Sequence, residues 1–383
     1  MFLTLKLLEF TYRKSKDTFA NFLIIEEPEA HIHNHIQKTL FDKLDYTDTQ
    51  IIYSTHSTQI SEVSNVENIN ILAKKLNFAE VFQPSNGLDP KNVNQIQRYL
   101  DAIRTNLLFA KGVILVEGDA EEILIPQMVK KAYGVSLDEL GISLINIRST
   151  GFKNVAQLFH DNRIRRKCSI LTDLDDAICD TTINDGESES SKKYKTKVEN
   201  SRIKGLERKV ILDEFEKDND WIKTFYAKYT FEVDFVMRGN AWEVEQIIDN
   251  VYVDKPTIKL TKEELDDEDV AVFGKRVLTM ANQEGKGWFA IMLGKHISYK
   301  TIVPDYIVEA IAFAKESYSK NIIADIIEYR VTKNAKDVEI DFTLLKEIIA
   351  SYRVDKATID EVIVEIKNRI PEDQILTFIE KVK

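Results

Sequence analysis

The sequence predicts a mixed α/β chain that ends in a helical region, and three observations support this. Short apolar runs alternate with amphipathic stretches over roughly residues 1–233, which is typical of parallel sheets with crossover helices. From about Ala241 onward, apolar residues instead recur at helical spacing. The chain has 383 residues, of which 44% are hydrophobic and 30% charged, enough for two or three globular domains.

The composition argues against several classes of protein. The net charge is -11, from 52 Lys and Arg against 63 Asp and Glu, which disfavours a protein that coats nucleic acid through its overall charge. No apolar run approaches the roughly 18 residues of a membrane helix. Cys168 and Cys179 form neither a disulfide framework nor a Cys-x-x-Cys metal site, and the first ten residues lack the features of a secretory signal. We therefore expect a cytoplasmic protein without membrane contact.

These patterns divide the chain into residues 1–108, 109–256 and 257–383. A stretch rich in Ser, Lys, Glu and Asn between residues 181 and 200 predicts a mobile insertion at about 176–215. The predicted strands are Phe22–Ile25, Ile51–Ser54, Ile69–Leu72, Gly112–Val116, Ser143–Ile147, Ser169–Leu171 and Lys228–Val233. The predicted helices are His35–Leu44, Val93–Leu107, one that ends at Lys131, Gly151–Asp161, and residues 262–283, 286–297, 303–318, 341–352 and 357–368.

Acidic residues stand at the ends of three predicted strands in the second segment. Glu117 and Glu121 follow the first, Asp173 and Asp175 follow another, and Glu232 lies near the end of the last. The carboxyl ends of strands in an open α/β sheet form its ligand-binding edge, so these acids are expected to converge. Because Asp173 and Asp175 are two residues apart, both would point to the same side of an extended segment.

Clustered carboxylates repel one another unless a cation lies between them. Divalent ions such as Mg²⁺ take oxygen ligands, and two ions about 4 Å apart are the usual apparatus for in-line attack on a phosphodiester. The alternative is that 63 acids in 383 residues produce such pairs by chance on solvated loops. Three acidic pieces, each at a strand end, favour a site for two Mg²⁺ or Mn²⁺ ions.

These motifs resemble a Toprim domain, the metal-binding fold shared by primases, topoisomerases, recombination proteins and nucleases of the OLD (overcoming lysogenization defect) family. The resemblance rests on the Glu-Gly strand end at Glu117 and on Asp173-Leu174-Asp175. Two further pieces look like OLD-type proteins in particular. Tyr229–Asp234 resembles their additional acidic strand, and Gly285–Ala290 resembles the helix that places a lysine next to the metals. The resemblance covers roughly residues 110–315.

The resemblance implies a role for each position. Glu117 and Glu121 would hold one metal together with Asp173, while Asp175 and Glu232 would complete the coordination of the pair. Lys286 would stabilise charge on the phosphate as it becomes pentavalent, and a surface lysine is the alternative. The neighbouring acids that compete for these roles are Asp119, Glu122, Asp176 and Asp234.

An earlier piece resembles the Walker B motif of ABC-type ATPases. Phe22–Pro28 is an apolar strand that delivers Glu26 to the position that supports Mg²⁺ and Glu27 to the position that polarises the attacking water. Glu29–His33 looks like the adjoining D-loop. His56 resembles the switch histidine that contacts the γ-phosphate.

Two parts of a complete nucleotide site are missing from the first segment. A P-loop, Gly-x-x-x-x-Gly-Lys-Ser/Thr, precedes Walker B in such ATPases, and residues 1–21 form neither a P-loop nor the signature serine loop. The chain therefore looks like the C-terminal part of an OLD-type protein, and ATP turnover is expected only with a complete ATPase domain. The spacing of His31, His33 and His35 also allows a metal cluster, although no Cys or acid pattern completes it.

Basic residues gather near the acids. Arg165 and Arg166 precede the strand that delivers Asp173, and residues 191–209 carry eight Lys and Arg against two Glu, a local charge of +6. This pattern fits contacts with DNA phosphates, and a solvated insertion is the alternative. The lysines predicted to contact DNA are Lys192, Lys193, Lys195 and Lys197.

The favoured function is a metal-dependent DNA endonuclease or nickase of the OLD type, active in anti-phage defence or DNA processing and regulated by an ATPase module. The resemblance also implies homo-oligomers, sometimes with a helicase-like or ATPase partner. A second hypothesis is a non-cleaving DNA-binding or regulatory subunit that completes the ATPase of a partner. A third is topoisomerase chemistry, which needs a nucleophilic tyrosine, and none of the 14 Tyr stands in an identifiable context.

Overall fold

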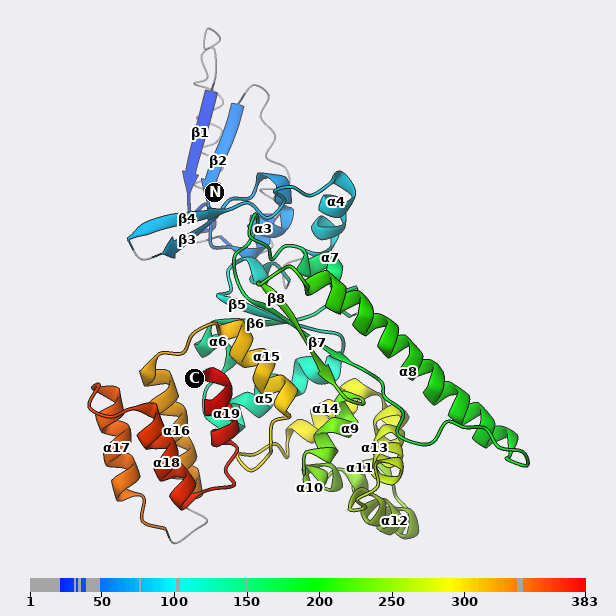
Figure 1. Cartoon of the computed structure of the whole chain (residues 1–383). Coiled ribbons are helices and arrows are strands. Elements are labelled where there is room, and N and C mark those ends of the chain that lie inside the picture. Colours follow the sequence, from blue (N-terminus) through cyan, green and yellow to red (C-terminus); the bar gives the residue numbers. More distant parts are fainter. Residues whose placement is uncertain are drawn as a thin grey trace. The chain divides into compact units, whose positions relative to one another are not determined.

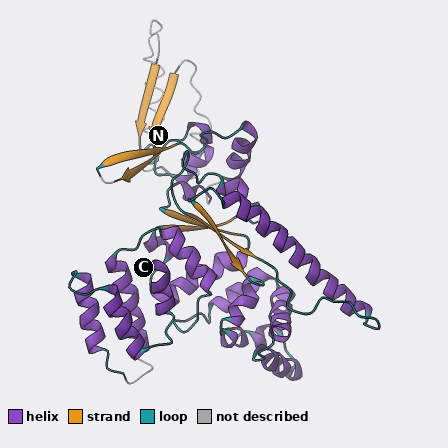
Figure 2. Ribbon diagram, viewed as in Figure 1, coloured by secondary structure: helices purple, strands orange, loops and turns teal. Residues whose placement is uncertain are grey.

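The computed structural model describes residues 21–30, 32–33, 36–38, 49–75, 77–100, 104–148, 151–335 and 340–383. The chain forms two compact units, one from the first 109 residues with Asn162–Ile164 and one from the remainder. Parallel strands and helices alternate, and the C-terminal region is helical, so the predicted α/β class is confirmed (Figure 1, Figure 2). Within the described ranges, no helix is both long and apolar enough to cross a membrane.

Two parallel strands organise the first unit. β1 (Asn21–Glu26) pairs with β2 (Thr49–Ser54), so both strands end at the same edge. α3 (Thr58–Val63) begins directly after β2, where the side chain of Ser57 caps its first turn. Most of the helix predicted at His35–Leu44 lies outside the described residues, as do His31 and His35 of the possible histidine cluster.

An antiparallel hairpin follows in the same unit. β3 (Ile71–Lys75) pairs with β4 (Phe78–Phe82), so the prediction that Ile69–Leu72 joins a parallel sheet is wrong. Two residues separate these strands, whereas a parallel return needs a dozen or more. α4 (Pro90–Tyr99) starts three residues earlier than predicted because Asp89 caps it and Pro90 occupies its first turn. The other elements are η1 (Val66–Asn68) and η2 (Arg104–Leu108).

Four parallel strands form the sheet of the second unit, in the order β6-β5-β7-β8. They are β5 (Gly112–Val116), β6 (Ile142–Asn146), β7 (Cys168–Asp173) and β8 (Ile222–Ala227). The chain runs from β5 outward to β6 and then crosses to β7 on the other side of β5. β5 and β7 therefore flank the switch point, where doubly wound sheets bind ligands outside the carboxyl ends of their strands. All five residues of β5 are buried, as in parallel sheets covered on both faces.

The last strand lies earlier than predicted. β8 ends at Ala227, and Lys228–Val233 forms a turn and the start of α9 (Phe231–Met237), so the prediction of a strand there is wrong. The carboxylate of Asp234 accepts hydrogen bonds from the backbone N–H groups of Lys228 and Tyr229. These bonds fix the start of α9, so the chain does not continue the hydrogen bonds of the sheet beyond β8. Glu232 is consequently carried by the first turn of a helix.

Most of the predicted mobile insertion is one long helix. α8 (Glu189–Glu216) spans 28 residues, and Ser188 caps its start. Lys, Glu and Arg are good helix formers, so the polarity of this segment reflects the exposure of a helix. Figure 1 shows α8 extending away from the sheet toward its N-terminal end. Nearer its C-terminal end, a Cβ added at Gly205 would lie 1.8 Å from the carbonyl oxygen of Leu174, so glycine allows the helix to contact the loop after β7.

Helices occur where the C-terminal periodicity predicts them, except that residues 262–283 belong to two helices. α12 (Lys255–Leu265) and α13 (Val270–Glu284) are separate because Asp269 caps the start of the second. α15 (Asp305–Lys315) packs against the sheet, and α14 (Lys286–Gly294) packs against α5 (Asp119–Tyr133). The remaining helices are α6 (Leu137–Leu140), α7 (Lys153–Ala156), α10 (Ala241–Glu245), α11 (Ile248–Val251), α16 (Lys320–Asn334), α17 (Thr343–Arg353), α18 (Ile359–Arg369) and α19 (Ile375–Val382).

A buried ion pair fastens the C-terminal helices to α5. Arg330 of α16 lies 2.6 Å from Asp373, with side-chain exposures of 6% and 4%. The same guanidinium donates a hydrogen bond to the carbonyl oxygen of Ala132, near the end of α5. The C-terminal helices therefore support the helix whose first turn carries Glu121.

Candidate functional site

Acidic side chains from four places meet at the switch point of the second sheet. Glu117 follows β5, Glu121 lies in the first turn of α5, and Asp173 ends β7. Glu232 lies in the first turn of α9. Glu121 is repelled by Glu232 and Glu117, while Asp173 is repelled by Glu121, Glu232 and Asp175. Glu121 and Asp173 thus link the five predicted carboxylates, because each of the other three acts on at least one of these two.

Burial changes the acidity of two of these groups. Desolvation raises the pKa of Glu121 from its usual 4.5 to about 7, and repulsion from Glu232 and Glu117 adds to the effect. The pKa of Asp173 is raised well above its usual value, again chiefly by burial and then by neighbouring carboxylates. A bound cation would favour the charged forms of both groups, so metal binding would release protons near neutral pH.

A lysine from a distant part of the chain joins the cluster. Lys286 is the first residue of α14, and its Nζ lies 3.0 Å from Oε2 of Glu232. Burial lowers the pKa of Lys286, but the carboxylates of Glu232, Asp173 and Glu121 together raise it above its usual value. The Lys286 side chain is 45% exposed and that of Glu232 only 1%, so the lysine lies at the rim and the glutamate inside. The preceding Gly285 has a φ of 90°, a conformation that favours glycine.

Two threonines that the sequence analysis missed orient the acids. The hydroxyl of Thr172 donates to Oε2 of Glu117 at 2.9 Å, and that of Thr230 donates to Oε2 of Glu232 at 2.9 Å. Both stand within two residues of a predicted site acid, which is the signal that could have identified them. The other oxygen of Glu232, Oε1, is buried and accepts no hydrogen bond. Leaving such an atom unsatisfied costs about 1–3 kcal/mol.

Asp175 is held differently from the prediction. Its φ is 53°, so the segment after Asp173 is not extended, and the premise that both side chains project from one side of a strand is wrong. Oδ2 of Asp175 accepts a hydrogen bond from Arg208 of α8 at 3.0 Å, and the same guanidinium donates to the carbonyl oxygen of Asp173. Asp175 therefore belongs to a turn that α8 fastens, while its charge still acts on Asp173.

The competing acids have other partners. The side-chain amide of Asn146 donates to Asp119 at 2.9 Å and to Glu122 at 2.8 Å. Asp176 accepts a hydrogen bond from the backbone of the next residue, and Asp234 accepts the two backbone bonds that close α9. These contacts give each of the four acids a hydrogen-bond partner at a strand end or a helix start, and their part in the site stays a prediction.

Tyr306 is a further group near the acids, and no sequence pattern marks it as a site residue. It is the second residue of α15, and burial raises its pKa, with the charges of Asp173, Asp234 and Glu121 adding to the effect. A tyrosine within an apolar helix looks like a core residue from the sequence alone. Only the packing of α15 against the sheet brings it near the site.

The acids fit divalent ions in their chemistry. Among the described residues, no three His, Cys, Asp or Glu side chains converge as a preformed metal site. The available donors are carboxylate oxygens, which suit Mg²⁺ and Mn²⁺. A cation would also compensate the unpaired oxygen of Glu232 and the crowded charges of Glu121 and Asp173.

The residues predicted to serve a nucleotide lie at the strand ends of the first unit. Glu26 ends β1, and Glu27 follows with a φ of 43°. His56 follows β2, and Glu26, Glu27 and His56 are all exposed. Glu29 joins the two strand ends, because its Oε1 accepts hydrogen bonds from the Thr55 hydroxyl and the His56 backbone N–H, both at 2.8 Å.

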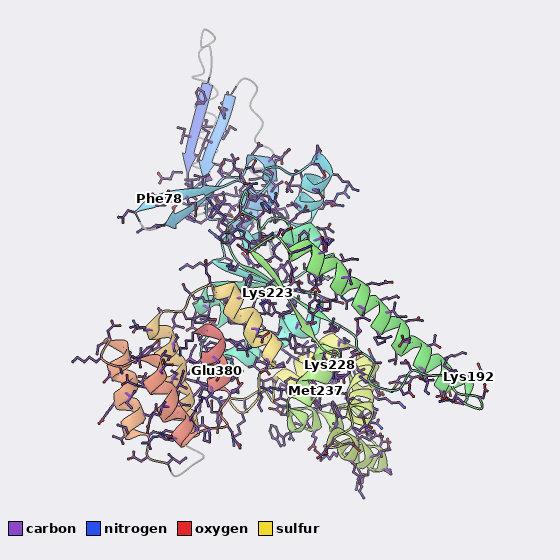
Figure 3. The ribbon with its side chains drawn as sticks, in the orientation of Figure 1. Phe78, Lys192, Lys223, Lys228, Met237 and Glu380 are labelled. Carbon is purple, nitrogen blue, oxygen red and sulfur yellow. The ribbon has the colours of Figure 1, made fainter. Side chains whose placement is uncertain are left out.

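The predicted DNA contacts differ in their surroundings. Lys195 forms an ion pair with Glu187 at 2.6 Å and donates to the Thr182 carbonyl oxygen, so it is folded back against residues 182–187. Lys192, Lys193 and Lys197 instead line a groove along α8. Figure 3 shows Lys192 near the outer end of this helix.

The two predicted arginines lie apart from this groove. Arg166 donates a hydrogen bond to the carbonyl oxygen of Ala110, and burial lowers its pKa. Arg165 is partly buried. Their role in DNA binding stays a prediction.

Two stretches of the chain match known protein families. Residues 108–175 match the family described as Overcoming lysogenization defect protein-like, TOPRIM domain. This part of the chain is an OLD-like Toprim domain. Residues 12–62 match an AAA domain family associated with AbiEii toxins of type IV toxin–antitoxin systems, so an ATPase-like segment precedes the Toprim domain.

Individual relatives match parts of the chain. YbjD, an uncharacterized protein of Escherichia coli (strain K12), is 27% identical over 179 residues, or 46% of this chain and 32% of the relative. The OLD nuclease of Thermus scotoductus is 31% identical over 116 residues, or 28% of this chain and 22% of the relative. The matches thus span about a third or less of these relatives. The solved C-terminal region of the Burkholderia pseudomallei OLD protein shares 26% identity, covering 54% of this chain and 98% of that structure with a TM-score of 0.41.

Proposed function

We propose that the second unit is a metal-dependent DNA endonuclease of the OLD type. One observation carries the proposal: Glu232, whose Oε1 is buried without a partner, lies among Glu121, Asp173 and Lys286 at the switch point. Burying several like charges is costly in a purely structural core. Such a cluster at the ligand-binding edge of a sheet supports a catalytic centre. Use of two Mg²⁺ or Mn²⁺ ions and a place in anti-phage defence or DNA processing belong to the same proposal.

The carboxylates would hold the ions. Glu117, Glu121, Asp173 and Glu232 are the principal candidates, and Asp175 would add the oxygen that Arg208 leaves unbound. When bound, divalent ions supply an activated water and neutralise charge on the phosphate. The hydroxyls of Thr172 and Thr230 would hold their acids in one orientation during the reaction.

Lys286 would act on the substrate. Its ammonium group lies at the rim of the site, where a phosphate oxygen can replace part of its contact with Glu232. A fixed positive charge at this place would stabilise the negative charge that develops on the phosphate in the transition state. The lysine would therefore affect the rate of cleavage more than the affinity for DNA.

The ATPase-like segment would regulate cleavage. Glu26, Glu27 and His56 would serve a nucleotide only as part of a complete ATPase domain, because the 383 residues contain no P-loop. Assembly into homo-oligomers and association with a helicase-like or ATPase partner extend this proposal.

Incubation of the protein with supercoiled plasmid separates the candidate functions. With Mg²⁺ or Mn²⁺ we expect nicked or linear DNA, and with EDTA no product. Binding without any cleavage in either metal would instead support a non-cleaving DNA-binding or regulatory subunit. Relaxed closed circles would indicate topoisomerase chemistry.

Asp173→Asn tests whether the acid cluster is the centre. The variant should reduce cleavage by about a thousandfold or more, because the two-ion site loses a central ligand. The fold should remain, because Asn is nearly isosteric with Asp and avoids the repulsion of Asp173 by the neighbouring carboxylates in the metal-free protein. Glu268→Gln, at an exposed acid before α13, is the matched control and should cleave like the wild type. Wild-type nicking by Asp173→Asn would refute the assignment.

A further inference from the structure

The long helix α8 carries a row of cations on one face. Lys193, Lys197 and Lys204 are separated by four and seven residues, which places them on the same side of a helix. We call these three residues the lysine stripe. They are exposed, and they line a groove whose other lining residues are Glu189, Lys192, Thr196, Asn200 and Ser201.

The charge of this groove is unbalanced. Glu189 is the one acid among its eight lining residues, and it lies 3.4 Å from Lys192. Within the part of the chain that the structure describes, no carboxylate forms an ion pair with the lysine stripe. A solvated helix face usually mixes charges of both signs, with acids and bases paired three or four residues apart. The stripe instead presents three available ammonium groups to an anion.

The stripe leads to the acid site. Arg208 lies four residues after Lys204 and continues the same side of α8. Its guanidinium contacts the carboxylate of Asp175 and the carbonyl oxygen of Asp173. From Lys193 to Arg208 the helix rises about 22 Å at about 1.5 Å per residue. This length corresponds to roughly six base pairs of duplex DNA at about 3.4 Å each.

The inner part of α8 is fastened to the sheet. The helix contacts the loop after β7 through Gly205, where a Cβ would meet the carbonyl oxygen of Leu174, and Leu212 is buried. The outer part extends beyond these contacts (Figure 1, Figure 3). Because one continuous helix joins both parts, the stripe holds a fixed position relative to Asp173.

We propose that the lysine stripe binds the phosphates of duplex DNA on one side of the acid site. The inference rests on the proposed nuclease function, because it names the surface that would hold the substrate of that site. The ends of the lysine stripe are 11 residues apart on α8, or about 16 Å at about 1.5 Å per residue, and such a row of cations suits a stiff polyanion. Lysine contacts with phosphates position the duplex without specifying its sequence.

The test measures DNA binding separately from cleavage. The triple variant Lys193→Gln, Lys197→Gln, Lys204→Gln is compared with the wild type by fluorescence anisotropy, with a labelled duplex of about 30 base pairs in EDTA over a series of salt concentrations. Three lost phosphate contacts should flatten the slope of log affinity against log salt by about 2.7, at about 0.9 per contact. An unchanged slope would overturn the proposal.

A matched triple variant controls for net charge. Lys255, Lys259 and Lys262 of α12 are also exposed and are spaced by four and three residues on one helix face. Replacing them with Gln should leave the slope unchanged, and an equal loss would show that overall charge, not the stripe, sets the affinity. Circular dichroism should show the same helix content in both variants, since all six lysines are exposed.

The plasmid assay distinguishes failure of this inference from failure of the proposed function. Metal-dependent cleavage by the wild type together with an unchanged slope in the stripe variant would overturn the stripe and keep the nuclease. A flattened slope without cleavage in Mg²⁺ or Mn²⁺ would keep the stripe as a DNA-binding surface and overturn the nuclease. A wild type that binds no duplex would overturn the stripe.

Discussion

Two regions of this protein place acids at the carboxyl ends of parallel strands, yet only one region buries them. In the first unit, Glu26 ends β1 and Glu27 follows it. Both are exposed, and Ile24 within that strand is 76% exposed. In the second unit, every residue of β5 is buried, and Glu232 lies inside the site. The same sequence pattern, an apolar strand followed by acids, thus gives two environments. The difference teaches that the covering elements, not the strand, set the chemistry of the acids.

Hydrogen bonding differs between the two regions as well. Glu29 of the first unit accepts bonds from Thr55 and His56, so it joins two strand ends. Glu232 of the second unit is bound through one oxygen to Thr230 and Lys286, while its other oxygen has no partner. Both glutamates keep one buried oxygen without a hydrogen bond, Oε2 of Glu29 and Oε1 of Glu232. The difference lies in their neighbours, because Glu29 joins two strand ends whereas Glu232 lies within reach of the charges of Glu121, Asp173 and Lys286.

The largest effect among the following tests is expected for Lys286→Ala. The variant removes the fixed positive charge that Lys286 would hold beside the phosphate. The cleavage rate should fall by about 10²-fold or more, with little change in DNA affinity. Single-turnover cleavage and anisotropy measure the two quantities. Lys295→Ala, at an exposed lysine just after α14, is the control. Equal losses of rate and affinity would make Lys286 a simple phosphate contact.

An intermediate effect is expected for Glu121→Gln on thermal stability. The pKa of Glu121 is about 7 in the folded protein and 4.5 in its usual range, so between these pH values the folded state holds a proton that the unfolded state releases. The stabilisation is complete below pH 4.5 and is lost as the pH rises through 7. In EDTA at pH 8, the variant should therefore melt a few degrees above the wild type.

Divalent metal should reverse the order of the two melting temperatures, so that the wild type melts above Glu121→Gln. Mg²⁺ or Mn²⁺ should stabilise the wild type at pH 8 more than Glu121→Gln, because the variant lacks one ligand. Differential scanning fluorimetry in EDTA and in each metal gives both comparisons. If metal raises the melting temperature of the variant as much as that of the wild type, Glu121 is not a metal ligand.

The smallest effect is expected for Glu29→Gln in the first unit. Weakening the bonds to Thr55 and His56 should destabilise the ends of β1 and β2 by about 1–2 kcal/mol. Hydrogen exchange should rise in those strands, and metal-dependent cleavage without ATP should stay at the wild-type rate. A loss of cleavage comparable with that of Lys286→Ala would contradict the division between the two regions.

The sequence identified the site acids better than the backbone that presents them. Glu117 and Asp173 stand beside long apolar runs, so their strand ends were visible in the pattern. The apolar residues around Glu232 predict a strand, but Phe231 and Val233 are buried residues of α9. Periodicity over so few residues does not separate a short strand from one helical turn.

For the polar segment of α8, the sequence pattern and the structure disagree. Its composition predicts a mobile insertion, although Lys, Glu and Arg also form helices readily. The carboxylate of Asp175 and the backbone contact at Gly205 fasten this helix to the acid-bearing turn. Such contacts join residues about 30 positions apart, which local patterns do not report.

The sequence by itself determined the α/β class, the two acid-bearing strand ends and the candidate lysine, because apolar periodicity and residue chemistry are local properties. Tertiary structure alone decided which acids became unusual. Burial raised the pKa of Glu121 and Asp173, left one oxygen of Glu232 without a partner, and brought Lys286 across 54 residues to meet it. Desolvation and charge repulsion depend on everything that packs around a group, so they emerge only when distant segments of the chain come together.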